Sequence, residues 1–263
     1  MPQFSTMSKS LLVQTTHAQI FKNAFEILAE VFEEIDMQFD KDGLQIIQAD
    51  NTLSCVVHVR LDANAFDTYE CNKTTLIVCG INTQMFCKIL NNCGSDEFIS
   101  LSVDDNSLHL IILFKNKNDN VVKYYHKMKF TTTCEREIRF PPQEFDVTFS
   151  MPCKIFVNIL DIFERVDHFK LECSPDKVGF ICPDNNTTSV FFDAHLFAIK
   201  SRITTSFNNV YEIKLLRALT SDIESIAYDV DIYTKANYPL IIGCTIGTLG
   251  YFRVLIQNIK IEQ

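Results

Sequence analysis

The sequence lacks most of the motifs on which enzyme active sites depend. Glycine and proline occur only seven times each among 263 residues, which leaves few tight turns or phosphate-binding loops. No G-x-x-x-x-G-K loop, G-x-G-x-x-G fingerprint, H-E-x-x-H helix or G-x-S-x-G elbow occurs. The sequence therefore gives no support to a nucleotide-dependent enzyme, a zinc protease or a serine hydrolase.

Cysteine is frequent but follows no metal-binding pattern. None of the ten cysteines forms a C-x-x-C pair, and the six histidines complete no zinc spacing. We interpret most of the thiols as small buried hydrophobic groups in a reducing compartment, and we predict no metal and no cofactor. A Cys–His nucleophile pair is the remaining catalytic alternative, which leaves a cysteine-dependent enzyme as a distant possibility.

Long apolar runs and an excess of positive charge are also missing. No basic segment followed by an apolar stretch opens the chain, and no run is long enough to span a bilayer. We therefore expect a soluble intracellular protein with no membrane partner. The formal net charge of −9 opposes DNA binding by bulk attraction, so any contact with DNA must depend on a local patch or on shape.

An internal repeat organises what is present. Asp40-Lys41-Asp42-Gly43-Leu44 returns in the second half of the chain as Asp176-Lys177-Val178-Gly179-Phe180. Two flanking pairs recur in the same order, at offsets close to half the chain: Val31-Phe32-Glu33 with Ile162-Phe163-Glu164, and Asp50-Asn51 with Asp184-Asn185. The pattern predicts two copies of one fold unit, each with the same turn before Leu44 or Phe180.

Each half shows two amphipathic helical patterns among short strands. Apolar residues recur at three- and four-residue spacing in four segments, and each opposite face carries one or two Lys or Arg residues. The predicted inward residues are Phe21, Ala24, Phe25, Leu28, Val31 and Phe32, then Met85, Ile89 and Leu90, then Ile155, Phe156, Ile159, Leu160 and Phe163, and finally Leu215, Leu216, Leu219 and Ile223. The second helix is expected over Thr83–Cys93 and the fourth from Tyr211 to about Glu224.

Alternating patterns predict strands around these helices, which gives an α+β class. The consecutive prolines Pro141 and Pro142 cannot donate to a strand ladder, so residues 129–146 are expected to form an extended connector. We therefore predict an N-terminal domain over 1–128 and a C-terminal domain over 147–263.

A series of short motifs follows one order along nearly the whole chain. The motifs are Gly43-Leu44-Gln45, Gln48-Ala49-Asp50, Phe66-Asp67-Thr68-Tyr69 with Cys71, Gly80-Ile81-Asn82, Met85, Lys88-Ile89-Leu90, Phe140-Pro141, Gln143-Glu144-Phe145, Met151-Pro152 and Tyr238-Pro239-Leu240. Together with the half-length repeat, this series resembles the sliding clamps of the proliferating cell nuclear antigen family. The resemblance runs from about Leu11 to the end of the chain and suggests a divergent, viral-type member.

The resemblance implies two similar DNA-clamp domains, each with two helices and antiparallel sheets, that assemble into a closed homotrimeric ring. Strands form the outside of such a ring, and helices line a hole that surrounds duplex DNA. Outward basic residues would contact phosphates without reading base sequence. The matching positions are Lys22, Lys88, Lys154, Arg165, Lys214 and Arg217. Because Glu26, Glu30 and Asp161 share these helix faces, the inner surface is expected to be less basic than is usual in the family.

The resemblance also implies a pocket that docks DNA polymerase, the clamp loader, the flap nuclease and ligase through short peptides. An exposed apolar hollow beside a connector suits a peptide with an apolar and two aromatic anchors. The expected walls are Ala49, Leu53, Val56, Phe140, Pro141, Pro239, Tyr251, Phe252 and Val254. Leu53 replaces a histidine common in the family, and Val254-Leu255 replaces a small residue and proline, so the preferred peptide is expected to differ.

Subunits of the family join through edge strands, here expected at Val121–Lys127 and Ser189–Ala194. The interface residues implied are Val121, Lys123, Tyr125, Val190, Phe191 and Phe192. A heterotrimeric checkpoint-type ring and a monomeric polymerase accessory factor remain alternatives. A replication clamp acts in the nucleus, or in a viral replication compartment if the chain is viral.

Overall fold

The computed structural model describes residues 9–73, 75–132, 144–182, 188–193 and 206–259. The chain divides into two compact units. Unit 1 takes its residues from Met1–Ile46, Val59–Arg136 and Thr248–Gly250, and unit 2 from Ile47–His58, Glu137–Gly247 and Tyr251–Gln263. Ile47–His58 therefore groups with the second unit, which a division at one connector does not anticipate. The domain boundaries at 128 and 147 stay a prediction.

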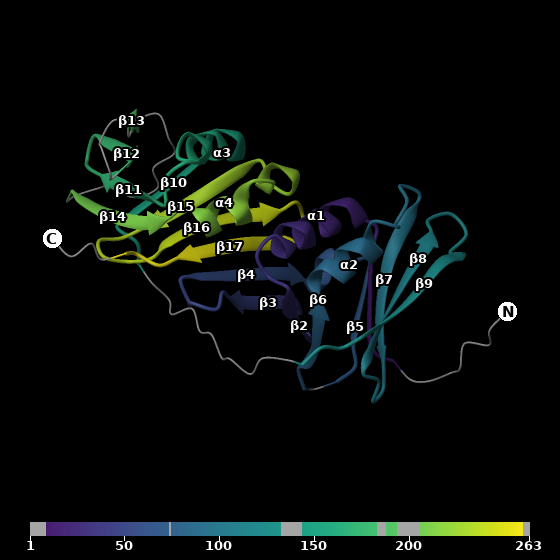
Figure 1. Ribbon diagram of the computed structural model, residues 1–263. Helices are drawn as coiled ribbons and strands as arrows, with labels where there is room; N and C mark the ends of the chain where they lie inside the picture. Colours follow the sequence, from purple (N-terminus) through teal and green to yellow (C-terminus); the bar gives the residue numbers. More distant parts are fainter. Residues whose placement is uncertain (1–8, 74, 133–143, 183–187, 194–205, 260–263) are drawn as a thin grey trace. The chain divides into compact units, whose positions relative to one another are not determined.

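Most of the first unit is built from strands and helices that follow one another closely. They are β1 (Lys9–Thr15), α1 (Ala18–Ala29), β2 (Glu34–Asp40), β3 (Gly43–Ala49), β4 (Cys55–Asp62), a short 3-10 helix (Ala63–Ala65), β5 (Thr68–Cys71), β6 (Ile77–Asn82), α2 (Thr83–Leu90), β7 (Glu97–Asp104), β8 (His109–Asn116) and β9 (Val122–Lys129). Figure 1 shows α1 and α2 side by side against these strands.

The second unit continues the chain with a similar succession of elements. They are β10 (Val147–Pro152), α3 (Cys153–Ile162), β11 (His168–Cys173), β12 (Lys177–Ile181), β13 (Ser189–Asp193), β14 (Phe207–Glu212), α4 (Lys214–Thr220), a short 3-10 helix (Ile223–Ser225), β15 (Asp229–Thr234), β16 (Leu240–Ile246) and β17 (Gly250–Ile256).

The strand orders of the two units match. Unit 1 contains the order β1-β7-β8-β9, with β5 added beside β1, and most of the order β4-β3-β2-β6. Residues 47–58, which include the end of β3 and the start of β4, group with unit 2. Unit 2 contains β10-β15-β16-β17 and β13-β12-β11-β14. Each strand of one series has a counterpart at the same place in the other, and all the strand pairs with a determined register are antiparallel. The predicted α+β class, with two copies of one unit, is confirmed.

The repeated turn is not preserved in detail. In the first copy Asp40 pairs with Gly43 across a tight turn, and Gly43 has a φ of 141°. In the second copy Cys173 pairs with Val178, so the turn lies before Lys177 and Gly179 sits within β12 opposite Glu172. The prediction that Gly179 occupies the same turn is therefore wrong. The absence of a side chain at Gly179 makes room for the ring of Phe191, which would lie only 2.4 Å from an added Cβ.

The helices bury their apolar stripes, although two stripes are rotated from the prediction. Phe25 of α1 meets Phe86 of α2 with ring centroids 4.8 Å apart. Met85, which was predicted to face inward, is 55% exposed because Phe86, Cys87 and Leu90 fill the buried positions. Ile155 is likewise 39% exposed beside the buried Phe156 of α3.

The fourth helix starts later than predicted. Tyr211 belongs to β14, where it pairs with Phe169 of β11 and is completely buried. Its hydroxyl donates to the carbonyl oxygen of Tyr238 at 3.0 Å, and Asn209 donates to the same hydroxyl at 2.7 Å. A strand that carries this polar network precedes Lys214, so α4 is confined to Lys214–Thr220.

The Gly43→Ala variant should lower the free energy of unfolding by at least about 2 kcal/mol. A φ of 141° is strained for any residue with a side chain, and a Cβ there would lie 2.1 Å from the carbonyl oxygen of Leu61. Gly94→Ala is the matched control, since its Cβ would approach Glu97 no closer than 3.5 Å. Urea denaturation of both variants measures the difference, and equal midpoints would contradict the geometry.

Candidate functional site

Most of the basic residues predicted to face DNA lie on the helices of the two units. Lys88, Lys154 and Lys214 are exposed on α2, α3 and α4. Arg165 is exposed too, but it lies in the turn beyond the end of α3 and not on the helix. Lys22 and Arg217 are half-buried, and each has a carboxylate partner. The exposed helix faces of the described part therefore hold fewer unpaired cations than the sequence suggested.

The partner of Arg217 explains why this arginine is oriented toward α3. Its Nη2 lies 3.0 Å from Oδ1 of Asp161. Lys22 of α1 faces Glu26 one turn later, at a longer 4.0 Å. Such exposed pairs contribute only about 0 to 1 kcal/mol to stability, but they reduce the charge available to a phosphate.

A hollow of about 400 Å³ lies between α3 and α4 within unit 2, on the side of the Arg217–Asp161 pair. Asp161, Glu164 and Asp167 line it together with Lys214 and Arg217. Three carboxylates against two cations make this hollow a poor phosphate site. The exposed Lys154 on α3 and Arg165 beyond it are not among its lining residues, so basic charge in unit 2 lies beside the hollow instead.

The loop after β3 displays a leucine in a strained conformation. Leu53 is 54% exposed and has a φ of 59°, a left-handed conformation that leucine rarely adopts. The carboxylate of Asp50 holds this loop, since it accepts from the backbone N–H of Thr52 at 3.0 Å and of Cys55 at 2.7 Å and from the hydroxyl of Ser54 at 3.3 Å. The free energy that this backbone conformation costs is not returned by packing, because the side chain is exposed.

The hydrogen bonds to Asp50 also set its titration. Burial by itself raises the pKa of this carboxyl, but the side-chain bond from Thr52, the backbone N–H groups of Cys55 and Thr52 and the hydroxyl of Ser54 outweigh it. The pKa of Asp50 is consequently lowered, and the loop is held by an ionised side chain at neutral pH.

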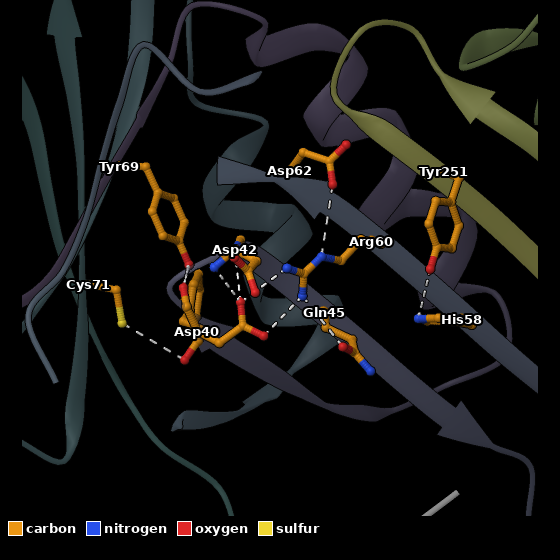
Figure 2. Close-up of polar contacts among 11 residues, drawn as sticks. Asp40, Asp42, Gln45, His58, Arg60, Asp62, Tyr69, Cys71 and Tyr251 are labelled. Carbon is orange, nitrogen blue, oxygen red and sulfur yellow. Dashed lines mark hydrogen bonds and ion pairs between the residues drawn. The ribbon is translucent and has the colours of Figure 1, made fainter. Parts of the chain in front are cut away.

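The first residues of β4 and the strand β17 form one face within unit 2. The backbone N–H of Gln257 donates to the carbonyl oxygen of Ser54 at 2.8 Å, and Tyr251 meets His58. The Tyr251 hydroxyl lies 3.4 Å from Nε2 of His58, with the two rings edge to face (Figure 2). Val56, on the same side of β4 as His58, is half-buried.

Two of the residues predicted for the docking pocket do not reach the surface. Phe252 and Val254 are completely buried, because alternate residues of β17 point into the core. Ala49, Val56, Pro239 and Tyr251 are half-buried and Leu53 is exposed, all within unit 2. Phe140 and Pro141 lie outside the described residues. The side chains of β17 that face away from the core are Tyr251, Arg253 and Leu255.

The turn between β2 and β3 is held by a cation that the sequence did not single out. Arg60 of β4 reaches Oδ1 of Asp40 at 3.1 Å and Oδ2 at 3.2 Å, and Tyr69 donates to the Asp40 carbonyl oxygen at 2.6 Å (Figure 2). Oδ1 also accepts the backbone N–H groups of Asp42 and Gly43. Burial raises the pKa of Asp40, but the Arg60 and backbone hydrogen bonds outweigh it and leave the pKa lowered.

The two strands predicted to join subunits lie at sheet edges. Among the described residues β9 pairs only with β8, and β13 only with β12. Val121, just before β9, and Tyr125 are 55% and 47% exposed, while Lys123 reaches the buried Glu97 at 3.3 Å.

Aromatic side chains dominate the β13 edge. Phe191 is 46% exposed, its ring lies over Gly179, and Nζ of Lys177 lies 4.4 Å from the ring centroid. Val190 and Phe192 are half-buried. Within the described part of the chain, both edges therefore present apolar surface beside strand backbone that pairs on one side only.

Most cysteines of the described part are buried as core residues, whereas Cys71 and Cys93 are half-buried. Burial raises the pKa of the Cys55 thiol to about 12, and the nearby Asp50 and Glu212 carboxylates add to the shift. Burial likewise raises the pKa of Cys79, Cys173 and Cys244 to about 12. Protonated thiols of this kind are poor nucleophiles. The described residues hold no group of three or more metal-ligating side chains.

The sequence is similar to known proteins along nearly its whole length. Residues 11–135 match the family described as proliferating cell nuclear antigen, N-terminal domain. A protein of Paramecium bursaria Chlorella virus 1, named "Probable DNA polymerase sliding clamp 1", is 28% identical over 257 residues, which cover 94% of this chain and 96% of that protein. Residues 11–135 therefore form a domain of the proliferating cell nuclear antigen family, and the similarity to a protein named as a sliding clamp extends over nearly the whole chain. No helix among the described residues is long and apolar enough to cross a membrane.

Three polar residues of this chain were missed by sequence reasoning. His58 and Arg60 alternate along β4 with the buried Val57, Val59 and Leu61, and Arg253 alternates along β17 in the same way. The period-two pattern of both strands carried the signal, because it places every second side chain on the face away from the core. The resemblance directed attention to the apolar neighbours instead.

In the Asp40→Asn variant the free energy of unfolding should fall less steeply as the pH is lowered. A carboxyl whose pKa is lowered by folding contributes stability above its unfolded value of 3.8, and this contribution is lost as the pH falls through the folded pKa. Chemical denaturation at a series of pH values from neutral down to the acid side of 3.8 measures the slope. Asp96→Asn, at an exposed aspartate of unit 1, is the control. Identical slopes for the wild type and Asp40→Asn would contradict the role of Arg60.

Proposed function

We propose that this chain is a subunit of a sliding clamp: copies of it join edge to edge into a ring that encircles duplex DNA and holds replication proteins on it. The observation that carries the proposal is a strand pair inside unit 2, where the first residues of β4 (55–58) lie next to β17. By the matched strand orders, β9 is the counterpart of β17 and β13 is the counterpart of β4. The free edges β9 and β13 therefore offer, between two copies, the same type of pairing that is already made within one.

A head-to-tail contact of this kind either closes into a ring or grows into a filament. We infer closure as a homotrimer, following the family, with Val121, Lys123 and Tyr125 on one edge and Val190, Phe191 and Phe192 on the other. Pairing would also satisfy the backbone groups of both edges and cover their apolar side chains. A heterotrimer with related chains and a monomeric polymerase accessory factor are the competing arrangements.

The proposed role requires no catalysis. Enclosure keeps the ring on the DNA, and a few phosphate contacts from Lys22, Lys88, Lys154, Arg165, Lys214 and Arg217 centre it without reading base sequence. Because Asp161 engages Arg217 and the net charge is −9, the grip on DNA should be weak and sensitive to salt. Weak contacts suit a ring that must slide.

Partner proteins would dock on the unit 2 face that carries Leu53, Val56 and Tyr251. We propose DNA polymerase, the clamp loader, the flap nuclease and ligase as the classes of partner, each through a short peptide with apolar and aromatic anchors. The strained display of Leu53 supports this face as the docking surface. The site of action would be the nucleus, or a viral replication compartment.

The mass of the purified protein at micromolar concentration tests the ring. Light scattering should give three times the chain mass of 30.2 kDa. Tyr125→Asp and Phe191→Asp should each reduce the mass to that of one chain, because a charge on either edge must be buried on pairing. Met85→Asp, at a side chain 55% exposed on α2, should leave the mass unchanged. A monomeric wild type would favour the accessory factor, and association only with a related chain would favour a heterotrimer.

The helix face is tested by two substitutions with opposite expected signs. Asp161→Asn releases Arg217 for a phosphate contact, and Lys214→Gln removes one. For binding to a short duplex, the slope of log affinity against log salt should steepen by about 0.9 with the first and become shallower by about 0.9 with the second. Lys41→Gln, on the exposed β2–β3 turn, is the control. Equal effects of both lysine variants would indicate bulk charge and not a helix-face contact.

A further inference from the structure

The outward side of β17 carries a cation where the resemblance suggested an apolar wall. Arg253 is exposed, whereas its neighbours Phe252 and Val254 are completely buried. Tyr251 and Leu255 flank it on the same side of the strand. The docking surface proposed above therefore includes a guanidinium group, and its charge is available to decide which peptides bind.

The side chain of Arg253 is held in place by its surroundings. Its guanidinium carbon lies 4.3 Å from the ring centroid of Tyr251, in a cation–π contact. Its Cγ lies over Gly243 of the neighbouring strand, where an added Cβ would be 3.5 Å from it and 3.6 Å from the ring of Tyr233. These are ordinary van der Waals distances, so the arginine stem packs closely against the strand at Gly243. A stacked guanidinium loses less conformational freedom on binding than a free one.

The N–H groups of this guanidinium remain available as hydrogen-bond donors. Among the described residues no carboxylate forms an ion pair with Arg253, and no side-chain or backbone oxygen accepts a hydrogen bond from it. Asp231, opposite Gly243 on β15, accepts a hydrogen bond from the Ser150 hydroxyl. A guanidinium fork stacked on an aromatic ring is a geometry that binds a carboxylate through two parallel hydrogen bonds.

The neighbouring strand places the apolar part of the surface beside the cation. The backbone N–H of Gln257 donates to the carbonyl oxygen of Ser54, and that of Asp62 donates to the carbonyl oxygen of Leu249, so Val56 lies opposite Leu255 and His58 lies opposite Arg253. A peptide that rests an apolar side chain against Val56 and Leu255 would therefore pass close to the guanidinium. Because the chain has a net charge of −9, an acidic residue would be repelled elsewhere on the surface and favoured only near such a cation.

We propose that Arg253 is a specificity-determining residue of the docking surface and that it binds the carboxylate of an aspartate or glutamate next to the apolar anchor of a partner peptide. The inference rests on the proposed function, since it presumes that peptides dock on this face of unit 2. It adds the charge of the preferred partner: an acidic residue beside the anchors, in contrast to the basic residues that the overall charge of the protein would attract.

Fluorescence anisotropy with short synthetic peptides tests the preference on the full chain. Each peptide carries one apolar and two aromatic anchors, and the set moves a single aspartate, asparagine or lysine through the flanking positions. At one position the wild type should bind the aspartate peptide about fivefold more tightly than the asparagine peptide. Arg253→Gln should remove this preference, and Arg253→Glu should reverse it in favour of the lysine peptide.

Two further variants separate the possible failures. Lys154→Glu makes the same change of charge on α3 of unit 2 and should leave the preference intact. Leu53→Asp should abolish binding of every peptide. Aspartate preference that survives Arg253→Glu, or that Lys154→Glu removes equally, overturns the role of Arg253 while the docking surface stands. Peptides that fail to bind the wild type, or that bind Leu53→Asp unchanged, overturn the docking surface and this inference with it.

Discussion

The alternation of buried and outward side chains along the strands governs the rest of this structure. In each unit the inner side chains of the strands and the apolar stripes of two helices form one core, as Phe25 and Phe86 do in unit 1 and Phe156 does in unit 2. Once this side is fixed, every second residue of β4 and β17 must face away from it. The positions of His58, Arg60, Tyr251 and Arg253 follow from that constraint and not from any feature of the polar groups themselves.

The architecture could be predicted from the sequence because repeats and periodicities are local signals. The internal sequence repeat, at an offset of about half the chain, indicated two copies of one unit, and the matched strand orders confirm this. Details that depend on tertiary neighbours were missed. Met85 and Ile155 look as apolar as the residues beside them, and only the packing of Phe86 and Phe156 decides which of each pair is buried. Tyr211 followed a helical pattern, but pairing with β11 and bonds to Asn209 and Tyr238 hold it in a strand.

The candidate surfaces were predicted in part for the same reason. Leu53, Val56 and Tyr251 could be named from motifs, whereas Phe252 and Val254 were assigned to a surface from which the strand period excludes them. The pairing of Arg217 with Asp161 joins residues far apart in sequence, so no local pattern announces it. Gly179 was assigned to a turn by its motif, yet it lies in a strand, where its missing side chain accommodates the ring of Phe191.

Leu53 makes the folded chain less stable than a glycine at the same position would. A leucine in the left-handed region costs on the order of 1 kcal/mol relative to glycine, and its exposed side chain returns little of that energy within the folded chain. Selection for stability alone would favour glycine or asparagine at this position, because both occupy this conformation readily. A leucine retained at this position would therefore mark selection for something other than folding. Variation at residue 53 among close relatives is a natural record of whether the loop still serves a partner.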